Sequence, residues 1–349
     1  MQVGIQFFPD VGPGVKSGRD YWQEALKLVA LCDRYGYSHV RTVEHYFHPY
    51  GGYSPNPVVF LAAAAQVSRK ARMVTGAVLP AFNNPLKVAG ELAMLDALSD
   101  GRLDAGFARA FLPHEFARFR VGLDESRARF DEGMEQVRRL LEEENVTVEG
   151  RFHSFRNVTS LPRPTQKPRP PFYVAALATK ESFERAGANG HGIMAIPMAG
   201  GAMAELLETY RAARAKAGHQ GRGTVMLAFH MLCHADQAEA VRLAKGPIER
   251  YLKSLVDAAS DWTSGASSAD YPGYDKVIAG LAKETFESQV EKCAAWVGTP
   301  ERILDTIATY QRQVGGFEIA SLQVNFNDIA YADAESSMRL FGERVLPKV

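Results

Sequence analysis

The feature that most constrains this chain is a regular alternation of short apolar, β-branched runs with longer stretches of helical periodicity. Eight runs are predicted to be strands: Val3–Phe8, His39–His45, Ala71–Leu79, Arg102–Ala108, Pro171–Leu177, Gly192–Ile196, Thr224–Leu232 and Phe317–Asn325. Helices are expected over Asp20–Tyr35, Pro57–Ser68, Leu86–Leu98, Ser126–Glu143, Lys180–Ala188, Met203–Ala217, Ala235–Val256, Pro300–Gln313 and Ala332–Leu346. Strands that alternate with helices pair in parallel, and eight such units are best satisfied by a closed (β/α)8 TIM barrel of the α/β class.

An open, doubly wound sheet is the competing architecture for the same alternation. Such a sheet usually carries a GxGxxG dinucleotide fingerprint after its first strand, whereas the loop here reads PDVGPG. That fingerprint, a GxxxxGK[ST] phosphate loop and a GxSxG nucleophile turn are all missing from the chain. The sequence therefore favours the barrel and gives no support to nucleotide hydrolysis or serine hydrolase chemistry.

We expect a single domain over residues 1–349, with two stretches that a barrel does not require. Residues 145–167 alternate polar and β-branched side chains around Glu149-Gly150, which predicts a hairpin insertion. Residues 260–280 are rich in serine, glycine and alanine, which predicts a mobile loop that could act as a lid.

Charge and cysteine content limit the classes of partner. Lys+Arg and Asp+Glu both number 40, so no overall field attracts nucleic acid or an anionic membrane. The three cysteines are far apart and form no CxxC pair, which argues against a disulfide framework and favours a cytoplasmic protein. The longest apolar run, Val58–Ala65, is far shorter than the roughly 18 residues of a membrane span. We therefore expect no nucleic-acid or membrane partner.

In a barrel of this kind the active site lies at the C-terminal ends of the strands. His45 ends the second strand and suits acid–base chemistry near neutral pH, although a histidine there is also often structural. Arg109 follows the fourth strand and Arg127 opens the next helix; both suit a phosphate or carboxylate, or a surface ion pair. Thr179 starts a helix, where free N–H groups bind anions or the threonine serves as a cap. Together they predict a site for one phosphate-bearing cofactor.

A metal site is not expected, because adjacent strand residues such as Glu44 and His45 point to opposite faces. His230 and His234 are likewise about 13 Å apart if their segment is a strand.

Aromatic residues at or just beyond strand ends predict an apolar substrate pocket. The residues expected to line it are Phe7, Phe8, Tyr46, Phe47, Phe82, Phe107 and Phe111.

Six segments lie in order along nearly the whole chain: EHYF (44–47), NPVVFLAAAAQVSRKARMVTGAVLP (56–80), LDALSDGRLDAGFARA (95–110), DESRARF (124–130), PPFYVAALATKES (170–182) and VGTPERI (297–303). As a set they resemble the bacterial luciferase-like, flavin-dependent monooxygenase family. The fold of that family is a single (β/α)8 barrel, in agreement with the strand count.

The resemblance implies FMN as cofactor and assigns residues to its ring. His45, at the first histidine of the family's EHH motif, would be the catalytic base or proton donor. Tyr46 replaces the second histidine, and Glu44 is expected beside the cofactor. Thr75-Gly76 match the position of a non-proline cis peptide bond under the flavin ring.

The same resemblance implies a phosphate site. Arg109 and Arg127 match the two arginines that contact the FMN phosphate. Ala176 and Leu177 replace an acidic and a hydroxyl residue, so Leu177 could contact the phosphate only through its backbone, with the Thr179 hydroxyl nearby.

The family's chemistry implies a two-component monooxygenase. A separate NAD(P)H:flavin reductase would supply FMNH2, dioxygen would convert it to a C4a-(hydro)peroxyflavin, and one oxygen atom would pass to a small apolar substrate. The absence of a nicotinamide-binding motif agrees with a separate reductase. A deazaflavin-dependent dehydrogenase and a flavin-binding protein without turnover are the alternatives. The family also implies a homodimer formed through helices that flank the early strands.

Overall fold

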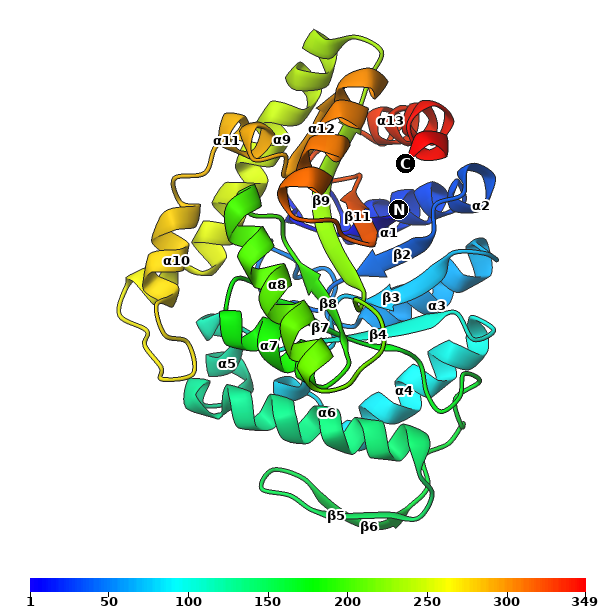
Figure 1. Cartoon of the computed structure of the whole chain (residues 1–349), viewed down its shortest axis with the longest axis vertical. Helices are drawn as coiled ribbons and strands as arrows, with labels where there is room; N and C mark the ends of the chain where they lie inside the picture. The colour runs from blue at the N-terminus through cyan, green and yellow to red at the C-terminus, as the bar shows by residue number, and fades with distance from the viewer.

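A computed structural model describes residues 1–349 and shows eight parallel strands closed into a ring (Figure 1). Around the ring these are β1 (Gln2–Phe7), β2 (His39–Thr42), β3 (Arg72–Thr75), β4 (Leu103–Ala108), β7 (Phe172–Ala176), β8 (Gly192–Ala195), β9 (Val225–Cys233) and β11 (Ile319–Gln323). Pairing of β8 with β9 and of β11 with β1 closes the ring. All eight predicted strands and the barrel are therefore confirmed, and the strands follow each other around the ring in sequence order.

Helices surround the ring close to their expected positions. They are α1 (Gly18–Val29), α2 (Cys32–Tyr35), α3 (Pro57–Val67), α4 (Pro85–Leu98), α6 (Ser126–Glu142), α7 (Lys180–Ala188), α8 (Gly200–Lys216), α9 (Gln237–Ala258), α12 (Pro300–Gln313) and α13 (Tyr331–Arg344). The side chains of Asn56 and Asn84 accept backbone hydrogen bonds at the starts of α3 and α4, where proline takes the first position. Gly36 ends α2 in a left-handed conformation at φ 81°.

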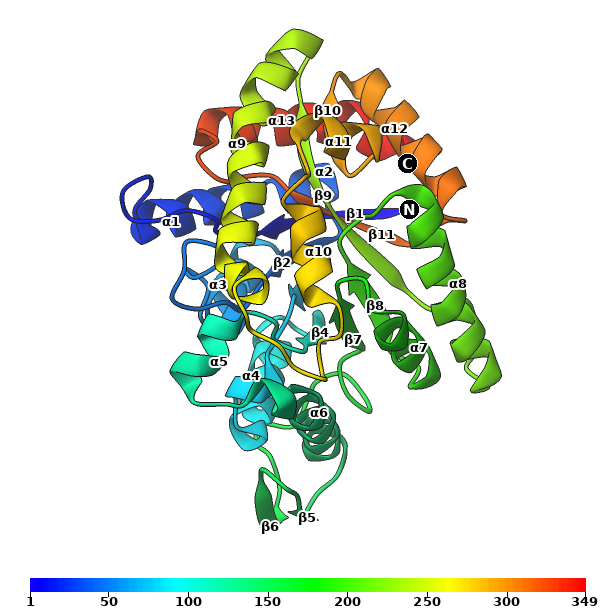
Figure 2. The same ribbon diagram turned by 90° about the vertical axis from the view of Figure 1, so that its left-hand side faces the viewer.

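Several short elements were not predicted. They are α5 (Pro113–Phe119), α10 (Tyr274–Leu281), α11 (Phe286–Glu291) and β10 (Ala295–Gly298), which pairs with the second half of β9 outside the ring. The expected hairpin is confirmed as β5 (Val146–Glu149) and β6 (Ser154–Val158). It projects beyond α6, away from the strand ring, in both views (Figures 1 and 2).

The segment expected as a loop over residues 260–280 has more structure than its composition predicted. A 3-10 turn, η3 (Ser260–Thr263), begins it, and α10 occupies its last third. Trp262, Tyr271 and Tyr274 are buried, so aromatic side chains anchor an otherwise polar stretch. Figure 2 shows the chain from η3 to the start of α10, hereafter the strap (residues 260–273), in front of the strands.

The strand ring is filled at one end and hollow at the other. Val74, Tyr173, Met194, Met226 and Ile319 form a separate apolar cluster inside the ring toward the N-terminal ends of the strands. The remaining interior space therefore opens at the C-terminal ends, where barrel enzymes place their chemistry. The three cysteines are buried free thiols, and none of the helices is long and apolar enough to cross a bilayer.

Candidate active site

A cavity of about 500 Å³ occupies the C-terminal end of the barrel. Its wall is formed by the ends of the strands together with α9, α10 and the turn before α11, and most of its lining residues are apolar. Among the residues predicted for the site, those that line it are Glu44, His45, Gly76, Arg109, Ala176, Leu177 and Thr179. The fold thus brings strand ends far apart in the sequence to one hollow, as the barrel hypothesis required.

His45 is held by a buried carboxylate that the sequence did not single out. Nδ1 of His45 lies 3.1 Å from Oε1 of Glu115, which is fully buried on α5. The same oxygen accepts a hydrogen bond of 2.8 Å from the backbone N–H of Tyr46. Because a carboxylate accepts hydrogen bonds, we assign the ring proton to Nδ1, which leaves Nε2 without a protein partner. The site therefore presents an imidazole of fixed orientation.

Glu44 and His45 both line the cavity but lie beyond the end of β2, so the strand alternation expected for them does not apply. Glu44 accepts hydrogen bonds from the Tyr46 hydroxyl at 2.5 Å, from Asn83 Nδ2 at 2.7 Å and from the Leu79 N–H at 3.1 Å. Burial raises the pKa of Glu44 to about 7, against the opposing effect of these donors. The hydroxyl of Tyr46, which stands where the family motif has a second histidine, therefore bonds Glu44, whereas the imidazole of His45 bonds Glu115.

Two arginines lie near this end of the barrel: Arg109 lines the cavity, and Arg127 lies outside it at the start of α6. Burial and the positive charge of Arg109 lower the pKa of Arg127. The guanidinium of Arg109 lies 4.3 Å from the centre of the Tyr271 ring and makes no ion pair. Arg127 has only a loose contact of 3.8 Å with the largely exposed Glu181. Two such cations held together are a site for an anion.

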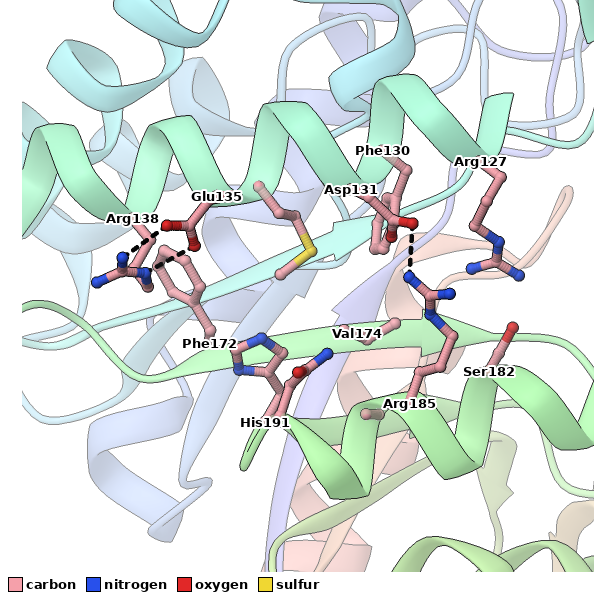
Figure 3. A pocket seen from close by; sticks show the side chains of 13 residues that line it. Arg127, Phe130, Asp131, Glu135, Arg138, Phe172, Val174, Ser182, Arg185 and His191 are labelled. Carbon is pink, nitrogen blue, oxygen red and sulfur yellow. Dashed lines mark hydrogen bonds and ion pairs between the residues drawn. The ribbon is translucent and has the colours of Figure 1, made fainter. Parts of the chain in front are cut away.

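Arg127 was expected beside Arg109, but it does not line the main cavity and instead borders a second hollow, a cleft of about 390 Å³ between α6 and α7. Figure 3 shows Arg127 and Ser182 together at one end of this cleft, opposite Arg138 and Glu135. Asp131 of α6 and Arg185 of α7 bridge it with an ion pair of 2.5 Å. Ser182 lines both hollows, so the cleft adjoins the main cavity at the start of α7.

The strap docks against the segments that carry the two arginines. Nε1 of Trp262 donates to the Phe111 carbonyl at 2.8 Å, and the Tyr271 hydroxyl donates to the Ala110 carbonyl. The Asp270 carboxylate accepts hydrogen bonds from the Ser126 hydroxyl at 3.3 Å and the Arg127 N–H at 2.8 Å. Asp270 therefore supplies the cap at the start of α6 that Glu125, in the cap position, does not.

Three details differ from the sequence-based expectations. The cis peptide bond joins Gly76 and Ala77, one residue beyond the Thr75-Gly76 pair. Thr75 does not line the cavity, because its hydroxyl bonds both the carbonyl and the N–H of Gly106 and ties β3 to β4. Thr179 stands at the N-cap position of α7, but its side chain makes no capping hydrogen bond. Burial raises the pKa of Tyr274, and a hydrogen bond from the Thr179 side chain opposes that shift, so the Thr179 hydroxyl faces Tyr274.

The cavity is largely apolar, as predicted, but most of the aromatic residues that were predicted to line it lie elsewhere. Phe8 and Phe111 line the cavity, whereas Phe7 and Phe107 are fully buried in the core. The remaining three, Tyr46, Phe47 and Phe82, pack with Phe116 and Phe119 of α5 in an aromatic cluster, mostly edge to face or tilted. Alanine, leucine and tyrosine side chains form much of the wall instead. Strand-end position alone did not reveal which way each ring points.

Comparison with known proteins identifies the family. The family described as luciferase-like monooxygenase matches residues 1–315. The crystal structure of the monooxygenase RslO1 from Streptomyces bottropensis is 43% identical, with a TM-score of 0.88 over 99% of both chains. The oxygenating constituent of 3,6-diketocamphane monooxygenase from Pseudomonas putida, a type II Baeyer-Villiger monooxygenase in complex with FMN, shares the fold at 21% identity, with a TM-score of 0.83 over 100% of this chain and 99% of that one.

A curated relative matches a shorter stretch. The oxygenase component of the flavin-dependent trigonelline monooxygenase of Acinetobacter baylyi is 34% identical over 182 residues, which are 52% of this chain and 50% of that protein. Over such matches the chain spans about half the length of these curated relatives. The match to residues 1–315 and the full-length likeness to RslO1 do not depend on that shorter stretch. The chain belongs to the luciferase-like monooxygenase family.

Proposed function

We propose that this protein is the oxygenase component of a two-component monooxygenase that uses reduced FMN. The observation that carries the proposal is a deep apolar cavity lined by His45 and Arg109, with a second arginine, Arg127, at the end of the cleft that shares Ser182 with it. The names of the relatives support it, because one is an oxygenase component and another was solved with FMN. A separate flavin reductase is then the partner that supplies the reduced cofactor.

The residues present fit FMN. Arg109, Arg127, the Thr179 hydroxyl and the free N–H groups at the start of α7 would hold the phosphate. Gly76 lines the cavity at the end of β3, where the ring would rest. When bound, reduced FMN supplies the electrons that activate dioxygen for transfer of one oxygen atom. Glu44, beside Gly76 in the wall, would face the ring.

The protein's own groups would then manage protons and water. His45, fixed through Nδ1 by Glu115, would accept or return a proton at Nε2. The apolar wall and the docked strap would exclude water from the reacting atoms. The substrate class that such a wall favours is a small, largely apolar organic molecule.

The phosphate assignment is tested with Arg109→Met and two ligands, FMN and riboflavin. We expect the Kd for FMN to rise by about tenfold or more, because a charge-assisted contact is lost. Riboflavin lacks the phosphate, so its affinity should stay unchanged in the same variant. Equal loss for both ligands, measured by fluorescence titration, would place the phosphate elsewhere.

The reaction itself is tested by mixing the protein and photoreduced FMN with oxygenated buffer. We expect oxidised FMN absorbance to return more slowly with stoichiometric protein than in buffer, since the cavity excludes water and controls protons. FMN that binds but reoxidises at the rate of free FMN would indicate a binding protein without turnover. Tight binding of a reduced deazaflavin, with no binding of FMN, would indicate the dehydrogenase alternative.

A further inference from the structure

A row of four polar side chains crosses the floor of the cavity. Gln6 on β1 is in register with Arg41 on β2 and with Gln323 on β11, and Gln323 is in register with His230 on β9. All four line the cavity, and none is more than 8% exposed. Residues in register on neighbouring parallel strands point to the same face, so these four, hereafter the polar row, form a continuous arc inside the barrel.

Much of the hydrogen-bonding capacity of the polar row is unused. Arg41 donates to Gln6 Oε1 at 2.7 Å and to the Gly76 carbonyl at 3.1 Å, but its Nε has no partner. Nε2 of His230 is also buried without a partner. Gln323 makes a single long contact, 3.5 Å from its Nε2 to the Phe8 carbonyl. Buried polar groups normally find partners, so this arc is incomplete as it stands.

The charge on Arg41 is likewise unbalanced. Its two hydrogen-bond partners are uncharged, and no aspartate or glutamate forms an ion pair with it. Burial lowers the pKa of Arg41 to about 10, which still leaves the guanidinium charged at neutral pH. An isolated buried charge costs several kcal/mol, whereas attraction to an opposite charge is strongest where water is excluded. An anion in the cavity would offset that cost.

The position of the Arg41 side chain depends on the absence of a side chain at Gly76. A Cβ atom at residue 76 would lie 1.9 Å from Arg41 Nε, so only glycine lets the guanidinium lie against the end of β3. Gly76 also lines the cavity, at the place where the proposed function would put the flavin ring. A role limited to bracing Gln6 and the Gly76 carbonyl would need hydrogen-bond donors but no charge. The positive charge of the Arg41 guanidinium is therefore not explained by bracing alone.

We propose that Arg41, supported by Gln6, Gln323 and His230, is the counter-charge for an anionic group that enters the cavity. The group is either the negatively charged ring of reduced flavin or an acidic oxygen, carboxylate or phenolate, of the substrate. The flavin source rests on the proposed function, whereas the substrate source can be tested without flavin.

The test compares wild type, Arg41→Lys, Arg41→Met and Arg41→Gln, each checked for folding by thermal denaturation. In the first arm, the affinities for reduced and oxidised FMN are measured in each protein. If flavin is the source, both neutral variants lose at least about tenfold of the preference for reduced over oxidised FMN, and lysine restores most of it. In the second arm, benzoate and its neutral isostere benzamide are titrated into the protein with and without FMN. If the substrate is the source, wild type prefers benzoate and the neutral variants lose that preference.

The arms separate the outcomes. A change in the first arm alone assigns the anion to flavin, and a change in the second alone assigns it to the substrate. Unchanged preferences in both arms for Arg41→Met and Arg41→Gln would overturn the proposal and leave Arg41 as a structural brace. If wild type binds no FMN, the proposed function fails, yet the benzoate arm without flavin still decides the role of Arg41.

Discussion

The orientation of His45 depends on one buried carboxylate. Glu115 lies on α5 and reaches back to both the His45 ring and the Tyr46 backbone through a single oxygen. Its other oxygen, Oε2, is buried without a hydrogen-bond partner. A carboxylate held in this way fixes the tautomer and the orientation of the imidazole. We therefore regard Glu115 as a positioning residue that acts through His45.

Glu115→Gln tests that role. The variant keeps the size of the side chain but removes the charged acceptor that fixes the imidazole. Reoxidation of bound FMN should therefore speed up toward the rate of free FMN, because the proton control that slows it in wild type is weakened. FMN affinity should stay within about twofold, because Glu115 does not line the cavity. Glu208→Gln, an exposed change on α8, serves as the matched control; a reoxidation rate equal to that of wild type in Glu115→Gln would assign Glu115 to packing alone.

Glu44 gives the protein a pH-dependent stability. Its pKa is raised by burial to about 7 in the folded protein, from 4.5 in the absence of structure. Between these two values the folded state holds a proton that the unfolded chain has released, so the free energy of unfolding falls as pH rises through this window.

Glu44→Gln should flatten that decline. Thermal denaturation at pH 5 and pH 8 is expected to show a smaller loss of Tm in the variant than in wild type. Burial also raises the pKa of Asp10 to about 7, but that contribution is common to both proteins and cancels in the difference. Parallel pH dependence in the two proteins would show that the three donors keep Glu44 ionised throughout.

Among the elements, the strap shows how a polar stretch becomes fixed. Its amino-acid composition, rich in serine, glycine and alanine, favours an irregular loop. Trp262 and Tyr271 nevertheless each donate a hydrogen bond to a backbone carbonyl just after β4. Asp270 adds the cap of α6 beside Arg127. Sequence periodicity detects none of these contacts, because each joins residues more than a hundred positions apart.

Asp270→Ala should release the strap without unfolding the barrel. The loss of two hydrogen bonds to the start of α6 is expected to cost about 1 to 2 kcal/mol locally. Faster proteolytic nicking and faster hydrogen exchange within residues 260–273 are the expected signs. Asp261→Ala, an exposed acid in the same strap, is the control; equal protection in wild type and Asp270→Ala would show that the aromatic anchors alone hold the segment.

At the scale of the whole molecule, exposed apolar side chains gather on two neighbouring helices. Val59 and Val67 of α3 and Leu86, Met94 and Leu98 of α4 are all exposed. α3 and α4 flank β2, β3 and β4, and they pack against each other. Exposed apolar clusters of this kind mark protein interfaces, which supports the homodimer that the family resemblance implies.

The homodimer is tested by sedimentation of wild type and Val59→Asp. We expect wild type at micromolar concentration to sediment as a dimer, and the variant to shift to monomer because a charge is costly within an apolar interface. Leu161→Asp, an equally exposed position beyond the hairpin, should leave the dimer intact. A monomeric wild type would remove the inference.

The sequence by itself determined the barrel, because the spacing of apolar residues decides which segments are strands and which are helices. It also determined that His45, Arg109, Ala176, Leu177 and Thr179 meet, since parallel strands bring their C-terminal ends to one side of the ring. Only the tertiary structure decided the partners of these residues. Glu115 reaches His45 across 70 positions, and Arg41 lies in the row with Gln6, Gln323 and His230 through the order of strands in the ring. Local patterns follow from neighbours along the chain, whereas a buried charge or hydrogen bond depends on which side chains the closed ring places together.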